Sequence, residues 1–180
     1  VTTVGAVAVI WRYLFHTSYG LVNWALAHVG IAPVDWLGDP RWAMPTIMLF
    51  AVWKNFGYNM VILLAGLQSI PKALIEAASI DGAGPWRRFW NIQLPLLSPT
   101  TFFLLVINIV YAFFDTFGII DAATQGGPGQ STSILVYKVY QDGFKALDLG
   151  GSAAQSVILM LIVVVLTVIQ FRYVEKKVQY

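Results

Sequence analysis

Long apolar segments are the feature of this sequence that most restricts its fold. The clearest covers residues 153–171, where the run LMLIVVVLTVI contains no charged residue. A helix needs about 20 consecutive apolar residues to cross the hydrocarbon core of a bilayer, and residues 43–67 and 101–120 provide two further segments of this kind. Residues 1–15 are predicted to be the end of another membrane helix whose start is missing. The predicted fold is an all-α, polytopic transmembrane helical bundle that is truncated at its N-terminus.

The composition supports a membrane protein and excludes several other classes. Charged residues make up 11% of the chain and hydrophobic residues 58%, whereas a soluble domain carries about 25% charged residues. The formal net charge of +2 does not suggest a nucleic-acid partner, and the absence of cysteine excludes disulfides and thiolate metal sites. The two histidines, His16 and His28, lack metal-ligand spacing. We therefore predict no metal site.

The distribution of Lys and Arg predicts the orientation in the membrane, because cytoplasmic loops are enriched in these residues. The loop over residues 68–100 and the C-terminal tail carry most of them: Lys72, Arg87, Arg88, Arg172, Lys176 and Lys177. The other two loops carry fewer: Arg41, Lys138 and Lys145. Both the 68–100 loop and the C-terminus are therefore predicted to be cytoplasmic.

The loop over residues 68–100 contains an unusually polar stretch, EAASIDGAGPWRRFWNIQLP. Ser69 and Pro71 can begin a short helix, and Gly82 can end it in a left-handed conformation. A second helix is expected to begin at Gly84-Pro85 and to stop at Pro95. Its predicted apolar face comprises Trp86, Phe89, Trp90 and Leu94. From the residues alone, this helical hairpin is either a docking surface for another protein or an interfacial hairpin anchored at the headgroups.

The same stretch resembles the EAA loop of permease subunits of binding-protein-dependent ABC importers. The resemblance rests on E-A-A, then D-G-A, an aromatic residue, and a hydrophobic-x-L-P ending. The residues that it identifies as coupling residues are Glu76, Ala77, Ala78, Asp81, Gly82, Ala83, Phe89, Leu94 and Pro95. The resemblance implies that the hairpin docks on an ATPase subunit and transmits its closure to the membrane helices.

The resemblance extends through FFLLVINIVYAFFDTFGIIDAATQGGP and GSAAQSV to the maltose-type sugar-permease branch. It is closest to the A-type permeases of sn-glycerol-3-phosphate importers and covers most of residues 43–180. It implies a type I (MetI-like) permease fold, with residues 1–180 in a single transmembrane permease domain and a coupling loop at about 69–99. It also implies a multi-pass protein of the bacterial inner membrane.

The partners implied by this resemblance are a second permease that completes a heterodimer, two ATPase copies, a periplasmic or extracellular substrate-binding protein, and membrane lipid. ATP and magnesium would belong to the ATPase, so no cofactor is expected on this chain. The sequence has no G-x-x-x-x-G-K-[ST] phosphate loop and no H-E-x-x-H or G-x-S-x-G pattern. We therefore expect no catalytic residues and a non-enzymatic subunit.

Polar residues inside the apolar segments are candidates for the substrate path, because such residues usually face a partner or a cavity. The candidates are Lys54, Asn59, Asn108, Tyr111 and Asp115. A phosphate would favour a cation such as Lys54 or Arg12. The alternative is structural: Lys54 and Asp115 would form an ion pair, and the asparagines would hydrogen-bond between helices.

Three other functions remain open from the sequence. A sugar or oligosaccharide permease would share every motif and differ in the path. A membrane-embedded enzyme would have Lys54 and Asp115 as its only acid–base candidates, and a channel would conduct without ATP. ATP dependence distinguishes a permease from both. The GGPG segment could be a plain outer turn or a contact for the substrate-binding protein.

Overall fold

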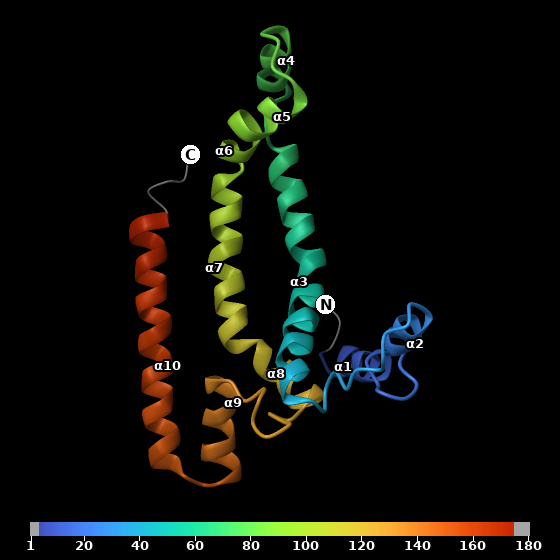
Figure 1. Ribbon diagram of the computed structural model, residues 1–180. Helices are drawn as coiled ribbons and strands as arrows, with labels where there is room; N and C mark the ends of the chain where they lie inside the picture. Colours follow the sequence, from blue (N-terminus) through green and yellow to red (C-terminus); the bar gives the residue numbers. More distant parts are fainter. Residues whose placement is uncertain (1–3, 175–180) are drawn as a thin grey trace. The chain divides into compact units, whose positions relative to one another are not determined.

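The computed structural model describes residues 4–174, with side chains described for residues 4–172. Every regular element in this part of the chain is helical, which confirms the predicted all-α class. The α-helices, labelled in Figure 1, are α1 (Val4–Leu14), α2 (Leu21–His28), α3 (Pro40–Gln68), α4 (Lys72–Ile80), α5 (Pro85–Arg88), α6 (Leu94–Leu96), α7 (Ser98–Phe114), α8 (Thr116–Ala123), α9 (Leu135–Tyr140) and α10 (Leu149–Ile169). Three π-helical turns join or extend them: η1 (Phe89–Gln93), η2 (Gln141–Lys145) and η3 (Gln170–Val174).

The described residues form two compact units. The first contains residues 4–54 and 111–162, and the second contains residues 55–110 and 163–174. The long helices α3, α7 and α10 contribute residues to both units.

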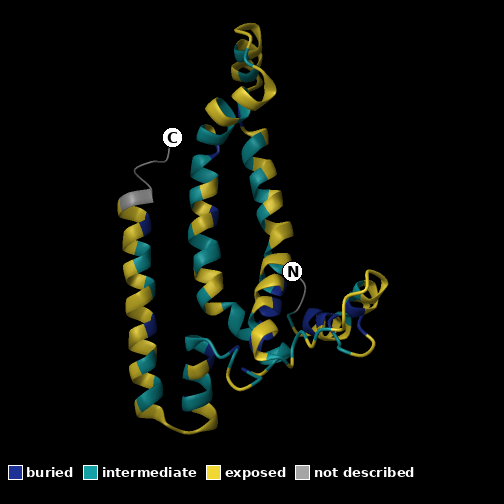
Figure 2. Cartoon of the chain, viewed as in Figure 1, coloured by how far each residue is buried: buried dark blue, intermediate teal, exposed yellow. Residues whose placement is uncertain are grey.

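Three segments are long and apolar enough to cross a membrane: Pro40–Gln68, Ser98–Ala123 and Leu149–Arg172. They contain the three complete spans predicted from the sequence, and each is longer than predicted. Only 6% of the most apolar window of the last segment is buried within the chain, and Figure 2 shows exposed residues along the length of α10. These apolar surfaces are therefore available to lipid or to another protein.

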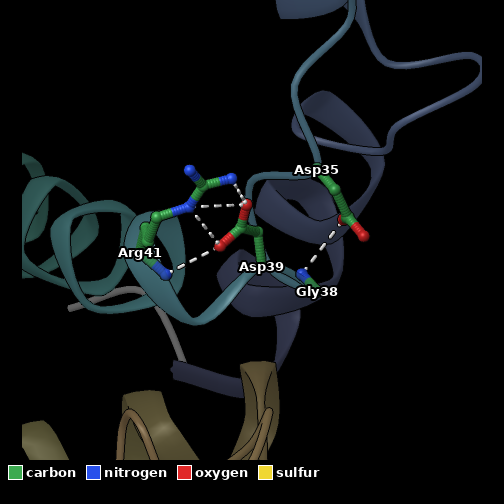
Figure 3. Close-up of polar contacts among 4 residues, drawn as sticks. All are labelled: Asp35, Gly38, Asp39 and Arg41. Carbon is green, nitrogen blue, oxygen red and sulfur yellow. Dashed lines mark hydrogen bonds and ion pairs between the residues drawn. The ribbon is translucent and has the colours of Figure 1, made fainter.

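The start of α3 lies three residues before the predicted Ala43, because Asp39 and Pro40 form a helix-start signal. The Asp39 carboxylate accepts a hydrogen bond from the backbone N–H of Arg41 at 2.9 Å (Figure 3). This is the N-cap contact to the second helical residue, and Pro40 occupies the first position, where no N–H is needed. The Arg41 guanidinium also pairs with Asp39 at 2.7 Å. This exposed pairing lowers the pKa of the Asp39 carboxyl group, chiefly through the side-chain hydrogen bond from Arg41.

The third span, Ser98–Ala123, contains the predicted segment over residues 101–120, and Asp115 inside it lies between two α-helices. Helix α7 ends at Phe114 and α8 begins at Thr116. Aspartate is a poor helix former, because its short polar side chain competes with the backbone for hydrogen bonds. The Thr116 hydroxyl also donates to the carbonyl of Tyr111, a long contact at 3.4 Å. The interruption places Asp115 at a junction between two helices.

Stacked aromatic rings form the core of the first unit. The Trp11 ring lies 4.8 Å from that of Phe15 and 5.0 Å from that of Phe50, measured between centroids and nearly parallel. Helix α1 packs along α8, and Tyr137 of α9 is fully buried in the same cluster. Burying each such ring removes a large apolar area from solvent. This packing joins α1, α8 and α9 to the first half of α3.

Asn23 organises the connection between α1 and α3. Its amide N–H groups donate to the carbonyls of Thr17 and Val34, at 3.0 and 2.8 Å. Its carbonyl oxygen accepts from the Val34 N–H and from the Trp36 indole N–H. All four hydrogen-bonding positions of this buried amide are therefore occupied.

Candidate functional site

The polar loop forms a helical hairpin at the ends of α3 and α7 within the second unit (Figure 1). Helix α4 covers nearly all of the predicted first helix and ends before Gly82, whose φ of +76° is left-handed. The N–H of Ala83 bonds to the carbonyl of Ala78 at 2.9 Å, which closes the turn. Helix α5 then begins at Pro85, as predicted.

Two details of this hairpin differ from the prediction. Ser69 does not cap α4: its hydroxyl donates to the carbonyl of Gly66 at the end of α3, and Pro71 occupies the N-cap position. Pro95 does not stop the second helix but lies inside α6. A proline clashes with the carbonyl four residues earlier, and the π-helical turn η1 directly before α6 widens the backbone there. The predicted face of Trp86, Phe89, Trp90 and Leu94 therefore does not follow a single α-helical period.

The surface of the hairpin is open. Glu76 and Asp81 are exposed, and neither carboxylate forms a hydrogen bond or ion pair with a side chain of the described residues. The side chains of Ile80 and Trp86 are 87% and 77% exposed. A shallow groove of about 190 Å³ lies between the two helices, lined by Ala78, Asp81, Ala83, Arg87, Asn91 and Ile92. The hairpin thus presents acidic groups and large apolar side chains that the described chain does not cover.

Lys54 and Asp115 form an ion pair in the first unit. The Lys54 Nζ lies 2.5 Å from Asp115 Oδ2. The Lys54 side chain is 14% exposed and the Asp115 side chain is 40% exposed. The contact joins α3 to the junction between α7 and α8, so the ion pair expected as one alternative is present.

Asn59 and Asn108 form a reciprocal amide pair in the second unit. Asn59 Nδ2 donates to Asn108 Oδ1 at 3.1 Å, and Asn108 Nδ2 donates to Asn59 Oδ1 at 2.7 Å. Each amide also donates to a carbonyl one turn earlier on its own helix, that of Asn55 or of Leu104. All four amide N–H groups are therefore used, and the pair has no donor left for an anion while it stays closed.

Arg12 lines a crevice of about 650 Å³ in the first unit. Sequence reasoning did not find this crevice, because its walls come from three separate segments. Its polar lining includes Arg12, His16, Thr17, Asp35 and Thr124. Tyr111, another path candidate, is 37% exposed on α7.

Sequence reasoning also missed a polar cluster after α9. The Asp142 carboxylate accepts a hydrogen bond from Gln155 at 2.6 Å and pairs with Lys138 at 2.9 Å. The hydrogen bond from Gln155 and, next, that from Lys138 hold the pKa of Asp142 below its usual value. The i, i+4 spacing of Lys138 and Asp142 is a signal that could have revealed half of this cluster.

The GGPG segment forms a compact loop around a buried threonine. The Thr132 hydroxyl lies 2.7 Å from that of Thr124 and donates to the carbonyl of Gly127. Gly126 has a φ of +83°, and a β-carbon there would meet the Tyr137 ring at 2.8 Å. The loop is therefore anchored to the aromatic core and is more than a plain turn.

Comparison with known proteins identifies relatives over nearly the whole chain. The model of the family described as "Binding-protein-dependent transport system inner membrane component" matches residues 4–180. The chain is 59% identical over 173 residues to the sn-glycerol-3-phosphate transport system permease protein UgpA of Yersinia pseudotuberculosis serotype I. It is 57% identical over 175 residues to UgpA of Escherichia coli strain UTI89. Each match covers 96% of this chain and 58% of the relative, so the chain spans somewhat more than half of their length.

Solved structures show a similar fold. A bacterial ABC transporter involved in the import of the acidic polysaccharide alginate matches with a TM-score of 0.86 and 26% identity, over 97% of this chain and 61% of that one. The alginate transporter in complex with an alginate pentasaccharide-bound periplasmic protein matches with a TM-score of 0.84 and 26% identity, over 93% of this chain and 58% of that one.

Proposed function

Because the chain belongs to the family of binding-protein-dependent transport system inner membrane components, we propose that it is a permease subunit of an ATP-driven importer of sn-glycerol-3-phosphate. It forms half of a translocation pore, and a second permease forms the other half. Two ATPase copies bind and hydrolyse ATP, and a periplasmic or extracellular substrate-binding protein delivers the substrate. The chain itself is non-catalytic and works as one transmembrane domain of the bacterial inner membrane.

The exposed α4–α5 hairpin is the observation that carries the coupling part of this proposal. The described chain leaves its acidic groups and apolar side chains exposed, and exposed apolar side chains beside polar groups are typical of a surface that binds another protein. The cytoplasmic ATPase supplies that surface. Glu76 and Asp81 provide charge for recognition, while the small residues between them allow close approach. The positive-inside argument supports the cytoplasmic side for this loop and for the C-terminus.

The substrate part of the proposal rests on Lys54. A phosphate ester needs a cation in the path, and Lys54 presents one inside the second predicted span. Relatives that are 57% and 59% identical to this chain are sn-glycerol-3-phosphate permeases. Tyr111 and Asp115 are further candidates for contact with substrate, whereas the amide N–H groups of Asn59 and Asn108 already bond each other and their own helices.

An acidic sugar is the second candidate substrate, because an alginate importer shares the fold. A uronic acid carboxylate would also pair with Lys54. A permease for acidic sugars and one for sn-glycerol-3-phosphate would therefore differ in the shape and size of the substrate that they accept.

Uptake of labelled sn-glycerol-3-phosphate tests the proposed function. A strain without its own importer would receive the gene that carries this sequence, together with genes for the partner permease, the ATPase and the binding protein. We expect ATP-dependent uptake that maltose-type sugars and alginate oligosaccharides do not inhibit. Lys54→Met should abolish uptake while the complex still assembles. Transport of a sugar without transport of the phosphate ester would overturn the substrate, and ATP-independent transport would overturn the importer itself.

A further inference from the structure

We propose that Asp115 is a displaceable counter-ion, which occupies the place of the substrate's phosphate on Lys54 while the site is empty. This inference rests on the proposed function, because it needs a substrate that carries a phosphate monoester. In this proposal Asp115 does not bind the substrate. It controls which anions bind to Lys54 and promotes release of the substrate.

The geometry allows the carboxylate to leave without disturbing other contacts. Within the described residues, Lys54 is the only side chain that bonds the Asp115 carboxylate. The carboxylate does not cap α8, although Asp115 occupies the N-cap position. Breaking one ion pair therefore frees it.

The two partners differ in exposure in the way that displacement requires. The Lys54 side chain is 14% exposed, whereas the Asp115 side chain is 40% exposed. The described chain therefore does not enclose the carboxylate, which has room to turn away from Lys54. Asp115 also lies at the junction of α7 and α8, where the helix is already interrupted.

Charge balance makes the two anions compete for Lys54. A phosphate monoester carries a charge of about −1.5 to −2 near neutral pH and offers three acceptor oxygens. With Asp115 still in place, one lysine would face a charge near −3, and the two anions would repel each other strongly at contact distance. A phosphate therefore displaces the carboxylate, and the carboxylate returns when the phosphate leaves.

The exchange has two consequences for transport. In the empty site, Asp115 neutralises a lysine that would otherwise lie unpaired inside the membrane, which is unfavourable. During transport, it competes with the bound phosphate and so promotes release. Without it, Lys54 would bind anions too readily and release them slowly.

The kinetics of Asp115→Asn test this proposal in the complete importer. We expect the KM for sn-glycerol-3-phosphate to fall about tenfold, equivalent to about 1.4 kcal/mol, together with a lower maximal rate. Inorganic phosphate should become an effective inhibitor. Asp115→Glu should restore wild-type behaviour because it keeps the carboxylate.

Asp39→Asn is the matched control. It makes the same chemical change in an exposed ion pair of the same unit, and asparagine caps a helix as well as aspartate does. This variant should leave KM, maximal rate and phosphate inhibition unchanged.

A purely structural ion pair predicts a different result. Asp115→Asn would then lower the amount of complex and the maximal rate, with KM unchanged and no inhibition by phosphate. That outcome, or a raised KM, would overturn the counter-ion role while leaving the proposed function intact. Absence of uptake by the wild-type importer would instead overturn the proposed function, and this inference with it.

A labelling experiment keeps the test decisive if Asp115→Asn fails to assemble. Residues 1–180 contain no cysteine, so Thr116→Cys introduces the one label site in this part of the protein while Asp115 stays intact, and the importer without this substitution gives the background labelling. Binding of sn-glycerol-3-phosphate should change the rate at which a charged methanethiosulfonate reagent labels this position. An unchanged labelling rate at saturating substrate would contradict displacement.

Discussion

Replacing Asn59 and Asn108 by leucine measures how strongly the amide pair joins α3 to α7. Two interhelical hydrogen bonds connect these side chains, at 3.1 and 2.7 Å. Interhelical hydrogen bonds in membrane proteins contribute about 0.6 kcal/mol each on average and up to about 1.7. A coupling free energy of about 1 to 3 kcal/mol is therefore expected between the two positions.

A double-mutant cycle on the assembled importer in detergent provides the assay. Each single variant leaves the other asparagine without its hydrogen bonds across the helices. Each should therefore lower the free energy of unfolding by more than half of the loss seen in the double variant. The free energies of unfolding come from denaturation of wild type, both single variants and the double variant. Asn91, which is exposed on η1, supplies a control cycle with Asn59, and those two changes should be additive.

Additivity of Asn59→Leu and Asn108→Leu, within about 0.3 kcal/mol, would refute the reasoning, because coupled residues deviate from additivity by more than this. The same variants test the transport role of the pair. Since its four N–H groups are all used within the chain, the KM for an anionic substrate should not change. A KM that rises severalfold in either single variant would show that the amides contact substrate directly.

Three further predictions follow from single positions. Gly82→Ala should weaken ATPase binding by about 1 kcal/mol or more, because alanine is unfavourable at positive φ. Gly84→Ala is the control: a β-carbon at either glycine would contact no other atom, but φ of Gly84 is −65°, which alanine adopts readily. Pull-down of the ATPase compares the two variants. Asn23→Ala should destabilise the complex by about 2 kcal/mol or more, because it leaves buried backbone groups unsatisfied; equal thermal stability of variant and wild type would contradict this. The pKa of the Asp142 carboxyl group is lowered in the folded state, so its ionised form stabilises that state, and this stabilisation is lost as the pH falls below about 4. The free energy of unfolding should therefore differ less between pH 3 and pH 6 in Asp142→Asn than in wild type. An equal difference in both proteins would contradict a stabilising role for Asp142.

Local chemistry explains which parts of the fold could be predicted from the sequence. Gly82 was identified as a left-handed helix end because only neighbouring residues decide that conformation. The long spans were identified because their length and apolarity are properties of continuous segments. Pro85 likewise indicates the start of a helix, because the φ angle of proline is fixed at a helical value.

Contacts between distant segments explain what could not be predicted. The four hydrogen bonds of Asn23 join it to residues 6 to 13 positions away. The local sequence does not indicate which backbone or side-chain groups these partners are. The ion-pair partner of Asp115 is a lysine 61 positions earlier, which the sequence offered as only one of two alternatives. Pro95 was expected to end a helix, because a proline rule that considers only α-helical geometry overlooks the wider π-helical turn before it.

The two polar pairs on α3 point to different roles, although sequence reasoning placed them in one group. Both N–H groups of the Asn59 amide donate hydrogen bonds, one to Asn108 and one to its own helix. Separating the two asparagines would therefore leave several polar groups without partners at once. Lys54 has a single partner in the described chain, and that partner is an anion of the kind a substrate can replace. An amide pair that is fully satisfied stabilises one arrangement, whereas an ion pair with one exposed member can exchange. Lys54 and Asn59 are only five residues apart on one helix, yet Lys54 is the position at which we expect a substitution to change the binding of an anionic substrate.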